Sequence, residues 1–128
     1  MSKTVQIANK TIGENQNCFI TAEVGINHNG SLDLAKNLID IAVATGCDAV
    51  KFQKRTVDVV YTKEELEKER ESVFGFTNGD LKRGLEFGLE EYKEIDNYCK
   101  KKGIIWYASC WDKGSVDFIE QFNPPCYK

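Results

Sequence analysis

Three short apolar runs recur along the chain, and each is followed by polar residues and a segment of helical periodicity. The runs cover residues 18–24, 49–53 and 104–109, and they are rich in β-branched and aromatic side chains, which predicts strands. The first two begin about 30 residues apart, the spacing of a β-α-β unit. The pattern therefore predicts parallel strands joined by right-handed helical crossovers.

Apolar residues at helical spacing fill the segments between these runs. One helix is predicted to begin after a cap at Ser31 and to end at Gly46. A second is predicted over 90–102, and a third begins after Asp112, which can cap it. The side chains expected on the buried faces are Leu34, Ala35, Leu38, Ile39, Ile41, Tyr92, Ile95, Tyr98, Cys99, Val116, Phe118, Ile119 and Phe122.

The remaining segments are less regular. Residues 4–13 alternate apolar and polar positions around a turn, which predicts a short hairpin. Residues 54–88 hold a charged, helix-prone stretch at 61–71, with Glu64 placed to pair with Lys68, and then an aromatic, glycine-rich turn at 73–80. So long an excursion between a strand and its helix is typical of a lid or substrate loop, with a plain surface excursion as the alternative. A fourth strand is predicted to begin at 126–128.

A hairpin followed by β-α-β-α-β-α-β is typical of a parallel α/β domain. A closed eight-stranded barrel takes about 250 residues, and this chain has 128. Two architectures stay open on these grounds, each a single domain over 1–128. One is a small open α/β sandwich, and the other is the N-terminal half of a TIM (β/α)8 barrel.

Composition narrows the class of partner. The net charge of −3 gives no electrostatic reason to expect nucleic acid or an anionic membrane. No apolar run approaches the ~20 residues of a membrane span, and the N-terminus lacks a signal-peptide core. The five cysteines are scattered without a Cys-x-x-Cys pair, which indicates reduced thiols in a cytoplasmic protein rather than disulfides or zinc.

Polar side chains gather where the predicted strands end, which is where parallel α/β proteins build their active sites. Glu23 ends the first run, Lys51 and Gln53 the second, Ser109 the third, and Lys128 the chain. No glycine-rich nucleotide-binding motif is present. Two lysines and a hydroxyl instead predict a phosphate or carboxylate pocket. An ion pair between Lys51 and Glu23 is the structural alternative, and it is compatible with anion binding.

Three other residue types carry weaker signals. His28, the single histidine, is expected to be a hydrogen-bonded structural residue rather than a metal ligand. Cys110 has no histidine base in its motif, so we expect it to pack rather than to act as a nucleophile. Trp106 is expected to pack, and Trp111, at the mouth, either packs or touches substrate.

Five motifs, found in this order, resemble the N-terminal part of the sialic acid synthases. That family includes the synthases for legionaminic acid, pseudaminic acid and spore-coat polysaccharide. The resemblance runs from about residue 4 to the end of the chain. The motifs are Ala22-Glu-Val-Gly-Ile-Asn-His-Asn-Gly30, Val50-Lys-Phe-Gln-Lys54, Lys82-Arg-Gly-Leu-Glu-Phe87, Ala108-Ser-Cys-Trp-Asp112 and Pro125-Cys-Tyr-Lys128.

The resemblance implies a TIM barrel that condenses phosphoenolpyruvate with N-acetylmannosamine or a related aldose. A divalent metal, typically manganese, polarises the sugar aldehyde in the family, and the products are a nine-carbon keto-sugar acid and phosphate. The full-length protein is expected to be a homodimer. By matching position, Glu23 is the catalytic acid/base, Lys51, Ser109 and Lys128 are phosphoenolpyruvate ligands, and Gln53 lies beside them in the substrate site.

Two departures limit what this chain is expected to do. Many members have Ser-Thr-Pro-Phe-Asp where this chain has Ala108-Ser-Cys-Trp-Asp112, which changes the pocket wall. The metal-binding histidines, the C-terminal half-barrel and an antifreeze-like domain are expected beyond residue 128, so the isolated chain is expected to be inactive. The competing hypothesis is a stand-alone, non-catalytic anion-binding module, and the reading frame after Lys128 discriminates between the two.

Overall fold

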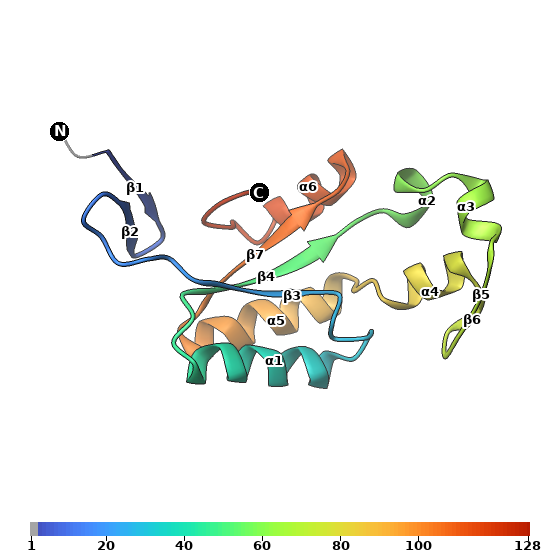
Figure 1. Ribbon diagram of the computed structural model, residues 1–128, viewed down its shortest axis with the longest axis horizontal. Helices are drawn as coiled ribbons and strands as arrows, with labels where there is room; N and C mark the ends of the chain where they lie inside the picture. Colours follow the sequence, from blue (N-terminus) through green and yellow to red (C-terminus); the bar gives the residue numbers. More distant parts are fainter. Residues whose placement is uncertain (1–2) are drawn as a thin grey trace.

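The computed structural model describes residues 3–128, and a parallel sheet of three strands lies at its centre (Figure 1). The strands are β3 (Thr21–Gly25), β4 (Ala49–Lys54) and β7 (Ile105–Cys110), in the spatial order β3-β4-β7. Sequence order and spatial order agree because each crossover places its strand beside the previous one. The predicted α/β class with a parallel sheet is confirmed.

An antiparallel hairpin precedes the sheet and stands beyond one end of it (Figure 1). Its strands are β1 (Thr4–Ile7) and β2 (Lys10–Gly13), which confirms the hairpin predicted for 4–13. An ion pair of 3.1 Å between Lys10 and Asp48 joins the hairpin to the loop that leads into β4.

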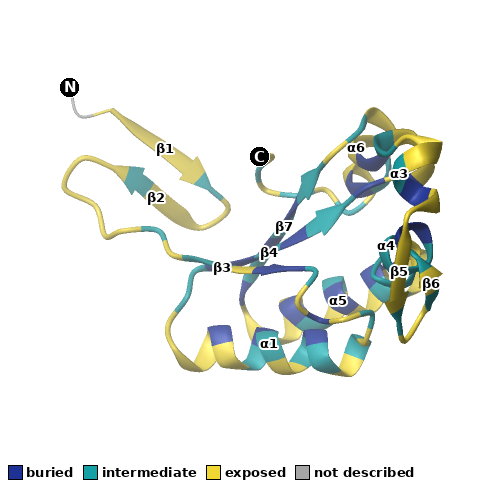
Figure 2. Ribbon diagram, turned by 45° about the vertical axis from the view of Figure 1, so that its right-hand side comes forward, coloured by how far each residue is buried: buried dark blue, intermediate teal, exposed yellow. Residues whose placement is uncertain are grey.

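Two helices, α1 (Leu32–Ala44) and α5 (Leu89–Lys102), lie side by side along one face of the sheet (Figures 1 and 2). The Ser31 side chain caps α1 by accepting from the Leu34 amide at 3.2 Å, as predicted. The shorter α6 (Lys113–Glu120) follows β7. None of the helices in residues 3–128 is both long enough and apolar enough to cross a membrane.

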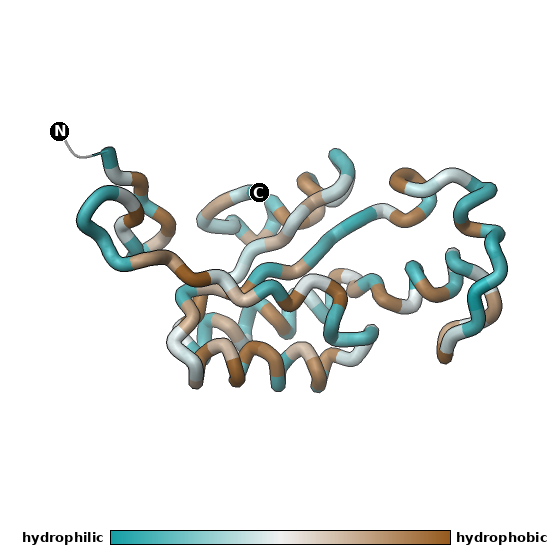
Figure 3. The backbone as a smooth tube through the Cα atoms, in the orientation of Figure 1, coloured by the Kyte–Doolittle hydropathy of each residue, from teal (hydrophilic) through white to brown (hydrophobic). Residues whose placement is uncertain are grey.

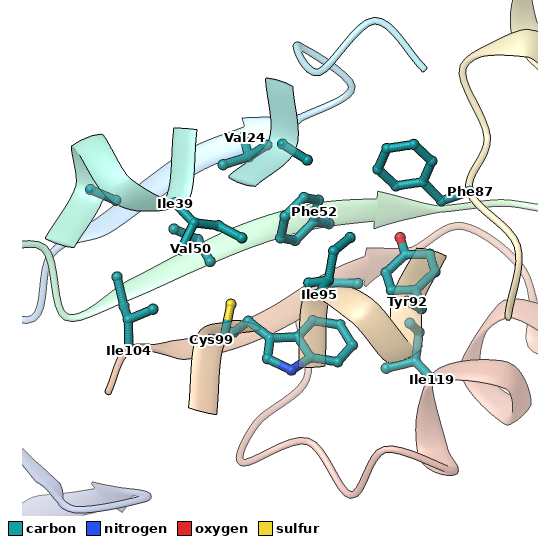
Figure 4. Packing of buried hydrophobic residues seen from close by; sticks show 14 residues of the cluster. Val24, Ile39, Val50, Phe52, Phe87, Tyr92, Ile95, Cys99, Ile104 and Ile119 are labelled. Carbon is teal, nitrogen blue, oxygen red and sulfur yellow. The ribbon is translucent and has the colours of Figure 1, made fainter. Parts of the chain in front are cut away.

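The core fills the space between the sheet and these helices (Figure 4). Phe52 of β4 is fully buried and meets Tyr92 of α5 and Trp106 of β7 edge-on, with ring centroids 6.3 and 6.4 Å apart. Ile39 and Ile95 add aliphatic contacts from α1 and α5. These apolar contacts all lie on the face of the sheet that the helices cover.

Two side chains predicted for the buried helix faces are instead exposed. Ile41 of α1 is 58% exposed and Val116 of α6 is 38% exposed, so both predictions were wrong. The face of α1 that meets the core consists of Ala35, Ile39 and Ala42. Small and branched side chains let the helix approach the sheet, and Ile41 lies to one side of that contact.

The first and last predicted strands also differ from the structure. Residues 18–20 lie outside β3. The backbone of Ile20 bonds with Asp48: its amide donates to the carboxylate at 2.8 Å, and its carbonyl accepts from the Asp48 amide at 2.8 Å. Residues 126–128 form no strand. The parallel sheet of the described residues ends at β7, and no ladder joins these three residues to it.

The excursion between β4 and α5, residues 55–88, is built from short elements, and the helix-prone stretch at 61–71 is helical only over Lys63–Glu67. The predicted pairing of Glu64 with Lys68 was wrong, because Lys68 pairs with Glu65. Figure 3 shows the excursion to be hydrophilic around α3 and β5, so it has little apolar surface to bury. The elements are α2 (Val57–Val60), α3 (Lys63–Glu67), β5 (Glu69–Ser72), β6 (Gly75–Thr77) and α4 (Asn78–Gly84).

A single aromatic side chain fixes the tip of the β5–β6 hairpin. The Phe74 ring packs where Gly30 and Gly84 have no side chain: a Cβ on Gly30 would lie 3.0 Å from that ring, and a Cβ on Gly84 would overlap it. Two glycines of the family-like motifs are therefore explained by packing. They join the excursion to the start of α1.

Candidate active site

Side chains alternate between the two faces of the sheet, so the face turned away from α1 and α5 receives polar residues. We call this the inner face. Lys51 pairs in register with Glu23 on one side, and Gln53 pairs with Ser109 on the other. The structure therefore brings together four of the five predicted site residues. The polar residues of the inner face are Thr21, Glu23, Lys51, Gln53, Tyr107 and Ser109.

An ion pair between Lys51 and Glu23 lies at the centre of the inner face. The Lys51 side chain is only 12% exposed, whereas that of Glu23 is 66% exposed, so the ammonium lies beneath a carboxylate that faces outward. The hydrogen bond from Lys51 lowers the pKa of the Glu23 carboxyl and outweighs the opposing effect of burial. Glu23 is therefore a carboxylate at neutral pH.

A bulge follows Glu23 in β3. The register with β4 shifts between Glu23 and Gly25, and Gly25 has a φ of +55°, a conformation that favours glycine. Bulges re-aim the neighbouring side chain and are common beside active sites. The Gln53 amide lies next to this bulge, with Nε2 3.7 Å from where a Gly25 Cβ would stand.

Tyr107 is an inner-face residue that sequence reasoning missed. It lies opposite Lys51 in the register and its hydroxyl is 3.1 Å from that of Thr21. The signal was available, since Tyr107 precedes Ser109 by two positions and so must share its face. Tyr107 and Thr21 join the two outer strands across the inner face, beneath the Lys51–Glu23 pair.

Lys128 is exposed at the end of the chain but still acts on the inner face. Its positive charge contributes to the lowered pKa of the Glu23 carboxyl, after the hydrogen bond and the charge of Lys51. Two lysines set against one carboxylate leave one positive charge in excess. An anion with several oxygens suits such a site.

Asp112 has a structural role at the same end of the sheet. Its carboxylate accepts from the Thr56 amide at 2.7 Å and from the Ser115 hydroxyl at 2.7 Å, and it caps α6 as predicted. Burial raises the pKa of this carboxyl, but the hydrogen bonds from Thr56 and Ser115 outweigh it and lower the pKa to about 2. Asp112 thus joins the end of β4 to the end of β7.

His28 is a structural residue, as expected. It is buried, its Nδ1 accepts from the Gly30 amide at 3.1 Å, and its ring stacks on Phe87 at 3.9 Å. Burial lowers the pKa of the imidazole to about 4, so it is neutral at pH 7. Within residues 3–128, no group of three or more histidine, cysteine or acidic side chains is placed to hold a metal ion.

Cys110 and Trp106 have the packing roles predicted for them. Burial raises the pKa of the Cys110 thiol, which disfavours the thiolate needed for nucleophilic attack. Trp106 is 7% exposed and donates from Nε1 to Asp96 at 2.9 Å. Trp111 differs, being 46% exposed at the end of β7.

Comparison with known proteins adds a family to this geometry. The NeuB family matches residues 38–128. Human N-acetylneuraminate-9-phosphate synthase is 39% identical over 119 residues, which cover 91% of this chain and 33% of that protein. Spore coat polysaccharide biosynthesis protein SpsE of Bacillus subtilis is 37% identical over 123 residues, covering 96% of this chain and 33% of that protein.

A solved structure agrees with these sequence matches. The N-acetylneuraminic acid (sialic acid) synthetase of Leptospira borgpetersenii, crystallised with citrate, superposes with a TM-score of 0.79 at 26% identity. The match covers 97% of this chain and 40% of that one. The parallel sheet with its leading hairpin is thus the fold of a sialic acid synthase segment, which confirms the predicted N-terminal part of a TIM barrel. The chain spans about a third of the length of the curated relatives it matches.

Proposed function

The chain belongs to the NeuB family, and from this premise we propose that it supplies the phosphoenolpyruvate-binding part of a sugar-acid synthase. The whole protein would condense phosphoenolpyruvate with N-acetylmannosamine or a related amino sugar, giving a nine-carbon keto-sugar acid and phosphate. One observation carries the proposal. The Lys51–Glu23 ion pair lies beside Gln53 and Ser109, on one face and at the carboxyl ends of parallel strands.

Lys51, Ser109 and Lys128 form the anion-binding part of the proposed site. Phosphoenolpyruvate has a phosphate and a carboxylate, and each accepts charge-assisted hydrogen bonds from ammonium groups. Lys51 is largely buried between β3 and β7, which fixes its position, and Lys128 is exposed and can follow the ligand. Gln53 lies beside these groups and is proposed to bind substrate through its amide.

Glu23 is proposed to act as a base in the resting enzyme, because its lowered pKa leaves it unprotonated. The methylene carbon of phosphoenolpyruvate forms the new bond to the aldehyde carbon, whose oxygen ends as a hydroxyl. Water then adds to the cationic C2 and gives one proton to Glu23, which passes it to the alkoxide formed from the aldehyde. Cleavage of the bond between C2 and the phosphate oxygen releases phosphate, which takes the remaining proton of the C2 hydroxyl, and leaves the ketone.

The divalent metal implied by the family, typically manganese, does not fit residues 3–128. The described residues hold no ligand cluster, and His28 is buried with Nδ1 already bonded. The metal ligands are therefore proposed to lie outside this chain, with the second half of the barrel and the antifreeze-like domain. A cytoplasmic location and a homodimer remain predictions for the whole protein.

The experiment is a turnover assay on the full-length protein that contains this chain. Phosphoenolpyruvate, N-acetylmannosamine and manganese are supplied, and both phosphate release and the mass of the product are measured. We expect stoichiometric formation of a nine-carbon acid and phosphate. If phosphoenolpyruvate binds but no acceptor sugar yields product, the anion-binding module is the better description.

A further inference from the structure

The β4–β7 register continues for one step beyond the two strands, and that step pairs Arg55 with Trp111. The last ladder pair is Lys54 with Cys110, and the Trp111 amide donates to the Lys54 carbonyl at 3.0 Å. The Arg55 guanidinium lies 5.5 Å from the centre of the Trp111 ring. Trp111 thus lies two residues, about 7 Å of strand, beyond Ser109, at the mouth of the candidate active site.

The Trp111 ring has two neighbours that hold it in place, and about half of the residue remains exposed. Tyr61 lies against it with ring centroids 6.5 Å apart, and Arg55, itself 4% exposed, bonds Tyr61 at 2.7 Å and Glu86 at 2.6 Å. Even so, 46% of Trp111 stays exposed. A fixed aromatic surface beside convergent polar groups is typical of a small-molecule site.

A second observation at the same place also points to a ligand. The Nη2 of Arg55 is buried and has no hydrogen-bond partner within residues 3–128. Buried donors in native proteins nearly always find an acceptor. Because Nη2 is closed to solvent, an oxygen atom of a ligand lying against Trp111 would reach it only where the side chains covering it move aside. This end of the sheet would then offer both an apolar surface and a donor.

From this juxtaposition we propose that Trp111 is the wall of the acceptor-sugar subsite, with Arg55 as the residue that positions it. The inference rests on the proposed function, because it takes the acceptor to be an N-acylated amino sugar. Such a sugar has C–H faces and a methyl group that pack on an indole ring, and carbonyl and hydroxyl oxygens for a guanidinium donor. Phosphoenolpyruvate, bound deeper at Lys51 and Ser109, would not touch Trp111.

The test compares Trp111→Ala, Trp111→Phe and Phe76→Ala in the full-length protein. Phe76 is the matched control: it is an aromatic residue with 74% exposure, on the hairpin beside α4 rather than at the mouth. We expect Trp111→Ala to raise the KM for the acceptor about tenfold or more, while the KM for phosphoenolpyruvate stays within about twofold. Trp111→Phe should recover most of the acceptor affinity, and Phe76→Ala should behave like the parent.

Three results would overturn the inference: an unchanged acceptor KM in Trp111→Ala, an equal rise in both KM values, or an equal effect of Phe76→Ala. If the parent protein shows no turnover, the proposed function fails, and calorimetric titration with N-acetylmannosamine decides the inference by itself. Binding to the parent that Trp111→Ala abolishes supports the subsite. If N-acetylmannosamine does not bind to the parent protein, the proposed acceptor subsite is wrong.

Discussion

The two faces of the same three strands differ in almost every physical property. The helix-covered face is dry and closely packed, with the Phe52 ring edge-on to those of Tyr92 and Trp106. The inner face holds a lysine–glutamate ion pair and a pair of hydroxyls, and its carboxylate is mostly exposed. One strand, β4, supplies residues to both faces in strict alternation.

This difference separates stability from chemistry. Free energy of folding comes mainly from apolar area removed from water, and that area lies between the sheet and its helices. The inner face contributes charged groups whose attraction is partly screened by solvent, so it adds little to stability. Substitutions on the two faces should therefore have opposite signatures in unfolding and in turnover.

The largest effect is expected from Glu23→Gln in the full-length protein. Loss of the base should lower kcat by about 10²–10⁴-fold with the melting temperature nearly unchanged. Because the pKa of Glu23 is lowered, the parent's activity should persist into mild acid and fall only as the pH drops through that lowered pKa. Steady-state kinetics across pH would show it, and a normal kcat in the Glu23→Gln variant would remove Glu23 from this role.

Phe52→Ala should have the opposite effect, with a large loss of stability and little change in the kinetics of the folded protein. It deletes a fully buried ring between α5 and β7, and such truncations cost about 3–5 kcal/mol of unfolding free energy. Urea titration should show a strongly lowered midpoint, while the folded fraction keeps the parent KM values. A stable Phe52→Ala protein with altered KM values would mean that the two faces are not separate.

Lys51→Ala should weaken phosphoenolpyruvate binding by about 10–100-fold, the equivalent of one charge-assisted hydrogen bond of about 1.5–3 kcal/mol. Lys10→Ala is the control, because Lys10 also pairs with a carboxylate, Asp48, but lies on the hairpin. The KM for phosphoenolpyruvate measures the effect. Equal values for the two variants would contradict the proposed anion site.

The smallest effect concerns Asp112 and acid stability. Its folded pKa of about 2 lies below the ~3.9 of an unfolded aspartate. Its contribution is therefore fully present above about pH 4 and is lost as the pH falls towards 2. Asp112→Ala should lower the free energy of unfolding at pH 6 by about 0.5–2 kcal/mol, the energy of the lost cap, and should make stability fall less steeply as the pH drops from 5 to 2. If the stability of the variant falls between pH 5 and 2 as steeply as that of the parent, the acid sensitivity comes from other carboxylates.

Much of the site could be predicted from the sequence because strand alternation is a local property. Lys51 and Gln53 had to share a face, and so did Tyr107 and Ser109, although Tyr107 was not used. The helix caps at Ser31 and Asp112 could be predicted for the same reason, since each hydrogen bond joins residues three positions apart. The roles of Glu23, Lys51, Gln53, Ser109 and Lys128 in binding and catalysis remain predictions.

The excursion could not be predicted from the same signals. Residues 61–71 have good helix propensity, yet the helix stops at Glu67 and a hairpin follows. Long-range contacts determine this path: Phe74 packs beside Gly30 and Gly84, and Arg55 bonds Glu86. Propensity is a weak preference, and contacts between distant residues override it.

The sequence by itself determined the order of the three core strands and their long helices, the leading hairpin and the residues that each strand places on its two faces, because these follow from short-range periodicity and backbone preference. Only the tertiary structure decided that Lys51 and Glu23 form the ion pair that the sequence left as an alternative, how exposed Glu23 is, and that Arg55 lies against Trp111. Those features depend on which strands become neighbours and in what register. Register is fixed by packing over the whole sheet rather than by any one segment.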